Sequence, residues 1–184
     1  MALTPRQIGD WLRAHPTEVV ARTRQPYDNG RLGYPRTMTG IDLRSPAFAD
    51  HGHLPRRHAG NGDNVSPPLS WSGIPREASE LALLCESVDA PPGGRPLWLV
   101  TGIDPRRTGL EAGTGHPGSH VHRNGYGDNG WGGPIASPGE PHRYVFRLYA
   151  LPAPVSIPHD VTADAAREVL DDQSVGHGTL VGRC

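Results

Sequence analysis

The sequence predicts a mainly β domain with few helices. The chain has 184 residues, of which 24 are glycine and 20 are proline. Proline cannot donate a hydrogen bond to a β-ladder or continue a helix, so this composition favours short elements joined by turns. The glycines and prolines punctuate apolar runs, such as residues 81–84 and 145–149, instead of forming a low-complexity tract. We therefore expect one ordered domain, long enough to bury a hydrophobic core.

The first predicted element is a short amphipathic helix near the N-terminus. Thr4 and Gln7 form a capping box, and residues 8–12 place apolar side chains at i, i+3 and i+4. The helical pattern breaks up soon afterwards. We expect residues 1–40 to form this helix and an irregular arm, and residues 41–184 to form the β domain.

Strand patterns begin at Ile41. Residues 41–43 alternate between apolar and polar, residues 81–85 and 97–100 are short buried-type runs, and residues 144–151 alternate in part. Clusters of turn-forming residues separate these segments. The pattern favours antiparallel strands.

One short helix is expected late in the chain. Thr162 can cap it, and Asp164 suits its first turn because the N-terminal end of a helix favours negative charge. Ala166, Val169 and Leu170 share one face and predict the side that packs on the domain.

The charge balance argues against nucleic acid as a partner. The chain has 18 basic and 19 acidic residues, for a net charge of −1, so no bulk positive field attracts polyanions. All the basic residues are arginine, which excludes a lysine that forms a Schiff base or acts as a general base. No cofactor is predicted.

No apolar segment approaches the roughly 18 residues that a membrane span requires, so we expect no stable membrane insertion. The N-terminus lacks a basic region followed by an apolar core, and the cytoplasm is the predicted compartment. Cys85 and Cys184 form no disulfide framework.

Four segments together carry the most specific signal. They are Asn64–Trp71, Val88–Pro91, Gly132–Pro134 and His142–Phe146. In this order and spacing they resemble the phosphatidylethanolamine-binding protein family, in its bacterial Raf-kinase-inhibitor-like branch. The resemblance implies a two-sheet Greek-key β domain with a small anion pocket, and it implies a homodimer. It does not cover residues 1–40.

The resemblance also implies which residues line the pocket, and it exposes two departures. The family usually reads Asp-Pro-Asp-Ala-Pro where this chain has Ser87 to Pro91, so the first aspartate is replaced by Ser87. A family histidine before an aromatic residue is replaced by Leu97. The implied ligand-binding residues are Ser87, Asp89, Pro91, Leu97, Trp131, Gly133, Pro134, His142 and Tyr144.

These departures change what the pocket can bind. An imidazole donates hydrogen bonds to an anion, whereas Leu97 offers an apolar wall and Ser87 a neutral hydroxyl. A charge-assisted hydrogen bond contributes roughly 1.5–3 kcal/mol, so its loss weakens anion binding about tenfold to a hundredfold. We expect a small-ligand-binding protein whose pocket favours a neutral or apolar ligand.

Other interpretations stay open at this point. Asp89 and His142 would be the catalytic pair of an enzyme that moves a proton or steers a cyclisation of a hydrophobic substrate. The chain could instead be a regulatory module that contacts other proteins. Asp89 could also simply cap a turn. Histidines around His53 and His122 permit a metal geometrically, but neither cluster contains cysteine and we expect no metal.

Overall fold

The computed structural model describes residues 39–90, 92–114, 119–135 and 142–184. Residues 36–184 form one compact unit. The helix and nearly all of the arm predicted for residues 1–40 lie outside the described residues. The last two residues of that arm form a strand of the main sheet, so the β domain begins slightly before Ile41.

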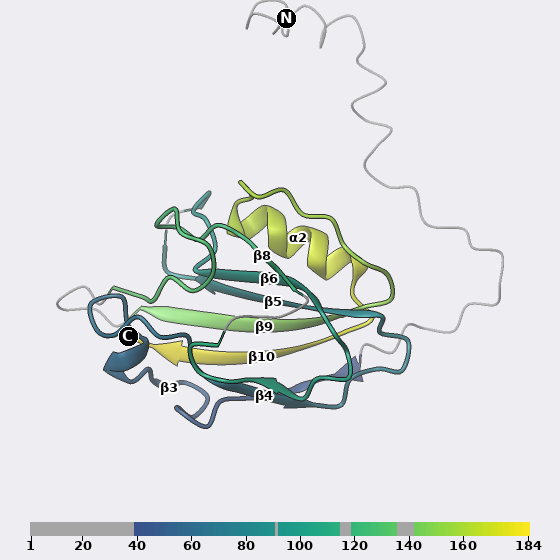
Figure 1. Ribbon diagram of the computed structural model, residues 1–184, viewed down its shortest axis with the longest axis horizontal. Helices are drawn as coiled ribbons and strands as arrows, with labels where there is room; N and C mark the ends of the chain where they lie inside the picture. Colours follow the sequence, from purple (N-terminus) through teal and green to yellow (C-terminus); the bar gives the residue numbers. More distant parts are fainter. Residues whose placement is uncertain (1–38, 91, 115–118, 136–141) are drawn as a thin grey trace, which may run out of the picture. The chain divides into compact units, whose positions relative to one another are not determined.

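The main sheet has seven strands (Figure 1). Its order is β1-β10-β9-β5-β6-β8, and β3 also pairs with β10. Neighbours are antiparallel, except that β1 and β3 run parallel to β10. The bounds are β1 Thr39–Gly40, β3 Gly52–His53, β5 Glu80–Ser87, β6 Trp98–Ile103, β8 His120–Val121, β9 Arg143–Leu151 and β10 Gly176–Arg183.

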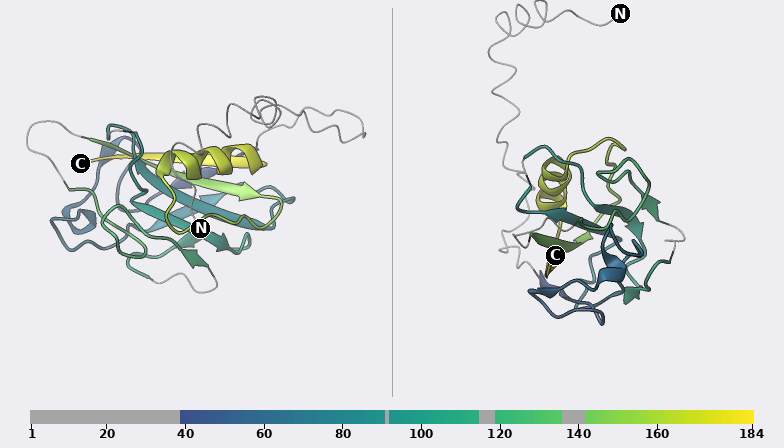
Figure 2. Two further views of the ribbon diagram at one scale, coloured as in Figure 1. Left: turned by 90° about the horizontal axis from the view of Figure 1, so that it is seen from above. Right: turned by 90° about the vertical axis from the view of Figure 1, so that its left-hand side faces the viewer.

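A smaller antiparallel sheet covers one face of the main sheet. It has the order β2-β4-β7, with β2 at Asp42–Arg44, β4 at Leu69–Ser72 and β7 at Gly109–Leu110. The helix α2, Ala163–Gln173, lies on the other face over β5 and β9 (Figures 1 and 2). A 3₁₀ turn spans Arg56–His58. This confirms the predicted fold class of two β-sheets with one late helix.

Strand β5 shows why the run at residues 81–85 lacks alternation. Leu81, Leu83 and Cys85 join the core between the two sheets, whereas Ala82 and Leu84 join the core under α2. Successive side chains of a strand point to opposite faces, and both faces are covered here. A strand buried on both faces is therefore apolar throughout.

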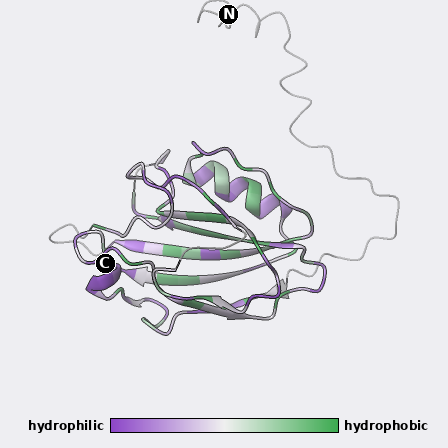
Figure 3. Cartoon of the chain, in the orientation of Figure 1, coloured by the Kyte–Doolittle hydropathy of each residue, from purple (hydrophilic) through white to green (hydrophobic). Residues whose placement is uncertain are grey.

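The late helix begins where the sequence predicts. The Thr162 hydroxyl oxygen accepts a hydrogen bond from the Ala165 backbone N–H at 3.3 Å. Ala166 and Leu170 are fully buried against the sheet, while Val169 is half-buried. Figure 3 shows both hydrophobic and hydrophilic bands along the helix, and its buried residues Ala163, Ala166 and Leu170 recur at the three- to four-residue spacing of an amphipathic helix.

Strand β10 was not predicted, although it pairs with β9 over as many residues as β5 does. Its sequence is glycine-rich, and glycine is depleted in strands. The buried face consists of three glycines and one leucine, at residues 176, 178, 180 and 182. A methyl group on Gly178 would overlap the backbone oxygen of Ile41, and one on Gly182 would overlap the side chain of Leu54. Close packing therefore explains why β10 contains so many glycines, and these glycines make the strand hard to predict from the sequence.

Candidate functional site

A pocket of about 660 Å³ lies where β5 ends and β9 begins. The connection from β5 to β6 forms one side, and the first turns of α2 close one end. Its lining residues are Glu86, Ser87, Val88, Asp89, Ala90, Pro92, Gly94, Arg95, Leu97, Gly125, Tyr126, Pro134, Ile135, His142, Tyr144, Arg147, Ala163, Asp164 and Arg167.

Six of the nine residues proposed from the sequence line this pocket. They are Ser87, Asp89, Leu97, Pro134, His142 and Tyr144. The register of the main sheet joins two of their segments, because Ser87 at the end of β5 pairs with Tyr144 near the start of β9. Segments far apart in the sequence are thus brought to one place.

The other three residues are placed differently. Pro91 lies outside the described residues. Trp131 is half-buried and packs against Trp98 and Phe146, with ring centroids 5.5 and 5.9 Å apart. Gly133 is buried, and its N–H donates to the Asn64 side-chain oxygen at 2.7 Å. Neither Trp131 nor Gly133 is among the described residues that line the pocket.

Asp89 is held by Arg143. One carboxylate oxygen accepts from the Arg143 backbone N–H at 2.7 Å and from its Nε at 3.2 Å. The other oxygen accepts from Nη2 at 2.7 Å. These bonds tie the β5–β6 connection to the start of β9. The side-chain and backbone hydrogen bonds from Arg143 lower the pKa of Asp89 to about 2.

This lowered pKa predicts a specific acid sensitivity. A carboxyl group whose pKa is depressed by folding stabilises the folded state above its unfolded pKa of 3.8 and loses that contribution as the pH falls towards about 2. The variant Asp89→Asn should be less stable than the wild type at pH 7. Thermal unfolding should show this difference shrinking between about pH 4 and about pH 2. A difference that stays constant over that range would exclude the assignment.

His142 is positioned through its backbone. Its N–H donates to the Cys184 carbonyl at 2.9 Å, and its carbonyl accepts from the Cys184 N–H at 3.0 Å. Within the described residues, no hydrogen bond joins His142 to Asp89, whose carboxylate bonds come from Arg143. The catalytic pair of Asp89 and His142 stays a prediction, since both side chains line the same pocket.

Two tyrosines contribute hydroxyl groups. Burial raises the pKa of Tyr144 to about 12, so its phenol stays protonated and can donate a hydrogen bond at neutral pH. The Tyr126 hydroxyl donates to the Gly133 carbonyl at 3.1 Å. Tyr126 thus connects the pocket to the buried segment that contains Gly133.

The pocket also has an apolar part. Leu97 is 9% exposed and lines the wall. Among the described residues, the large hydrophobic side chains that remain exposed are Val88, Tyr126 and Ile135, at 40%, 52% and 53%. All three line this pocket. Solvent-exposed apolar area is thus concentrated at one concave site, which is typical of a binding surface.

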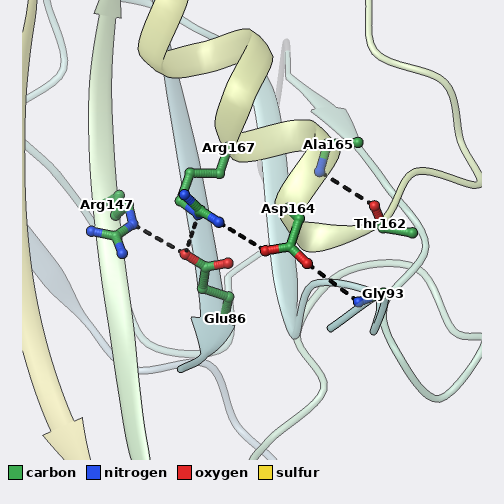
Figure 4. Close-up of polar contacts among 7 residues, drawn as sticks. All are labelled: Glu86, Gly93, Arg147, Thr162, Asp164, Ala165 and Arg167. Carbon is green, nitrogen blue, oxygen red and sulfur yellow. Dashed lines mark hydrogen bonds and ion pairs between the residues drawn. The ribbon is translucent and has the colours of Figure 1, made fainter. Parts of the chain in front are cut away.

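The end of the pocket at α2 is charged (Figure 4). One oxygen of Glu86 lies 3.2 Å from Arg147 Nε and 3.2 Å from Arg167 Nε. Arg167 Nη2 also contacts Asp164 at 2.8 Å, and the other Asp164 oxygen accepts from the Gly93 N–H at 3.2 Å. Backbone and side-chain hydrogen bonds, first from Gly93 and then from Arg167, lower the pKa of Asp164.

The sequence reasoning missed this charged end. The sequence does contain a signal for it, because Glu86 and Arg147 are charged residues within two mostly apolar strands. Charged residues are seldom buried unless they are paired. Two such interruptions in strands that pair with each other indicate a contact between them.

The histidine clusters do not converge on a metal site in the part of the chain that the structure describes. The Nδ1 atom of His58 lies 2.7 Å from the Val65 carbonyl oxygen. The Nε2 atom of His122 lies 3.1 Å from the Thr101 hydroxyl. None of the described helices is both long and apolar enough to cross a membrane.

Comparison with known proteins relates this arrangement to a family. The profile of the family "Phosphatidylethanolamine-binding protein" matches residues 44–184. The UPF0098 protein of the archaeon Methanothermobacter thermautotrophicus is 38% identical over 147 residues, which cover 77% of this chain and 97% of that protein. LppC of Mycobacterium tuberculosis, named as a candidate lipoprotein, is 36% identical over 143 residues, covering 77% and 71%.

A solved structure agrees with these sequence matches. It is CT736 from Chlamydia trachomatis, described as a candidate homologue of phosphatidylethanolamine-binding protein. It superposes with a TM-score of 0.68 at 31% identity, and covers 79% of this chain and 97% of its own. The family match, these relatives and the shared fold confirm the resemblance found in the sequence. The chain belongs to the phosphatidylethanolamine-binding protein family.

Proposed function

We propose that the protein binds a small organic molecule through an apolar part of that molecule, instead of binding a free anion. Membership of the family supports a small-ligand-binding protein in general. The observation that carries the finer proposal is the apolar lining. Leu97 lies in the wall, and the exposed side chains of Val88, Tyr126 and Ile135 surround the same pocket.

The polar groups beside Leu97, where β5 ends and β9 begins, suit an uncharged part of the ligand. Ser87 and Tyr144 carry hydroxyl groups, and the negative charge of Asp89 is engaged by Arg143. A few oriented polar groups in a largely apolar concavity fix the orientation of a ligand, while the apolar wall supplies most of the affinity. A free phosphate ion would gain nothing from Leu97.

The test compares a neutral apolar probe with inorganic phosphate. The fluorescence of phenylnaphthylamine should rise when the wild-type protein binds it, and phosphate should not displace it. The double variant Leu97→His with Ser87→Asp adds an imidazole donor and a carboxylate to orient it. We expect this variant to gain phosphate affinity by about tenfold to a hundredfold, as one charge-assisted hydrogen bond predicts.

The variant Leu97→Met is the matched control, since it keeps the wall apolar and should retain the neutral probe. Titration calorimetry with phosphate measures the gain. Wild-type protein that already binds phosphate as tightly as the double variant, or that fails to bind the neutral probe, would refute the proposal.

The homodimer and the cytoplasmic location predicted from the sequence remain part of this proposal. Neither the oligomeric state nor the cellular location changes which kind of ligand the pocket residues favour.

A further inference from the structure

We infer that the charged end of the pocket is a second subsite, in which Arg147, assisted by Arg167, binds an oxyanion group on the same ligand. The inference rests on the proposed function and deepens it. The ligand would be amphipathic, with an apolar body against Leu97 and the exposed apolar side chains, and a carboxylate or phosphate at the α2 end.

The accessible atoms at this end are those of the arginines. The side chain of Glu86 is 7% exposed, whereas those of Arg147 and Arg167 are 23% and 36% exposed. Glu86 and Arg147 come from adjacent antiparallel strands, and Arg167 comes from α2 above them (Figure 4). A molecule entering the pocket therefore meets guanidinium groups in front of the buried carboxylate.

Arg147 has donors to spare. A guanidinium group has five N–H donors, arranged as a planar fork that suits carboxylate and phosphate. Arg147 uses Nε to contact Glu86, and no acceptor for its two terminal nitrogens is found within the described residues. Asp164 does not compete for them, because its oxygens accept from Arg167 and from the Gly93 N–H.

A contribution to folding stability does not by itself explain why Glu86 is paired with Arg147 and Arg167. Replacing a buried ion pair with apolar residues of similar volume is often neutral or stabilising, because burial removes the hydration of both charges. Here Ala82, Leu84 and Tyr149 pack under α2 on the same face of the sheet, so an apolar pair would extend that core. Two arginines that share one carboxylate oxygen, inside a pocket, fit a role in binding.

The experiment compares two probes that differ by one anionic group. Anilinonaphthalenesulfonate has the apolar rings of phenylnaphthylamine and an added sulfonate. Wild-type protein should bind the sulfonate probe about tenfold more tightly, a difference that added salt should reduce. Arg147→Met should remove this difference and leave the neutral probe bound as before.

The variant Glu86→Gln should change the affinity for the sulfonate probe in the opposite direction to Arg147→Met. Removing the carboxylate charge releases both arginines, so affinity for the sulfonate probe should rise. A purely structural ion pair would give no such rise. If Arg147→Met alone fails to fold, the double variant Glu86→Gln with Arg147→Met replaces it, because the double variant leaves no buried carboxylate that has lost a partner. This double variant should bind both probes equally.

Arg106→Met is the matched control. Arg106 is 88% exposed, contacts Asp104 and lies outside this pocket, so the same change of charge should leave both probes unaffected. Octanoate and octyl phosphate, used as competitors, distinguish a carboxylate ligand from a phosphate ligand. Displacement of the sulfonate probe by either one supports the subsite.

Equal affinity of wild-type protein for the two probes, or an unchanged preference for the sulfonate probe in Arg147→Met, would overturn the proposed subsite. Failure to bind the neutral probe would instead refute the proposed function.

Discussion

Replacing Gly178 with alanine should destabilise the protein by about 3 kcal/mol, at the upper end of the usual cost of overpacking. The added methyl group would overlap the backbone oxygen of Ile41, with the Ile41 carbonyl carbon and Cβ each 3.0 Å away. Backbone atoms cannot rotate aside as a flexible side chain can. Relief would require β10 to move away from its neighbour, and β10 also pairs with β9 along its whole length.

Thermal unfolding measures this effect, and a loss of this size corresponds to a fall in Tm of about 6–12 °C for a domain of this length. Gly40→Ala is the matched control. Gly40 lies on β1 and pairs with β10 beside Gly178, but a methyl group there meets no atom within 4 Å. It should be neutral or slightly stabilising. Equal Tm values for the two variants would contradict the close-packing explanation of β10.

Gly133→Ala should have an effect of similar size, about 3 kcal/mol, and should also disturb the pocket. A methyl group there would lie 2.5 Å from the His58 carbonyl oxygen and 2.6 Å from the Gly60 nitrogen. The segment is anchored, because Gly60 N–H donates to the Pro134 carbonyl at 2.8 Å. Moving Gly133 displaces Pro134, which lines the pocket, and removes the acceptor of the Tyr126 hydroxyl.

Thermal unfolding and binding of the neutral probe should therefore both change in Gly133→Ala. The control is Gly125→Ala. Gly125 lines the pocket, but the nearest atom to a methyl group there is the Arg95 carbonyl oxygen, at an ordinary contact distance of 3.6 Å. Normal stability with weakened probe binding in Gly133→Ala would instead assign this glycine a direct contact with the ligand, as the sequence first suggested.

The sequence was enough to predict those elements whose local residue pattern matches their burial in the fold. The run at residues 81–85 is apolar because both faces of β5 are covered, and composition alone makes such a strand visible. Thr162 caps α2 through a contact only three residues away. Six residues proposed from the motif segments also line the pocket, and for Ser87 and Tyr144 the reason is that they pair with each other at the ends of β5 and β9.

The remaining features depend on contacts between distant segments. The glycines of β10 lower its strand propensity, and their reason is the approach of residues 41 and 54, far away in the sequence. Gly133 was assigned to ligand binding because of its motif, whereas the structure places it against the backbone of residues 58–60. The contact of Arg147 with Glu86 spans 61 residues, so the charges within these two strands become informative only once the strands are known to pair.

The position of β10 has a consequence for biosynthesis. Among the described strands, β1 and β3 join the main sheet through β10 alone, and β9 has β10 as its second neighbour. As a ribosome makes the chain from residue 39 towards residue 176, the edges of three strands lack their partner until β10 emerges. Unpaired strand edges promote aggregation, so the nascent chain carries an aggregation hazard during this interval, and the main sheet is completed only after β10 leaves the exit tunnel.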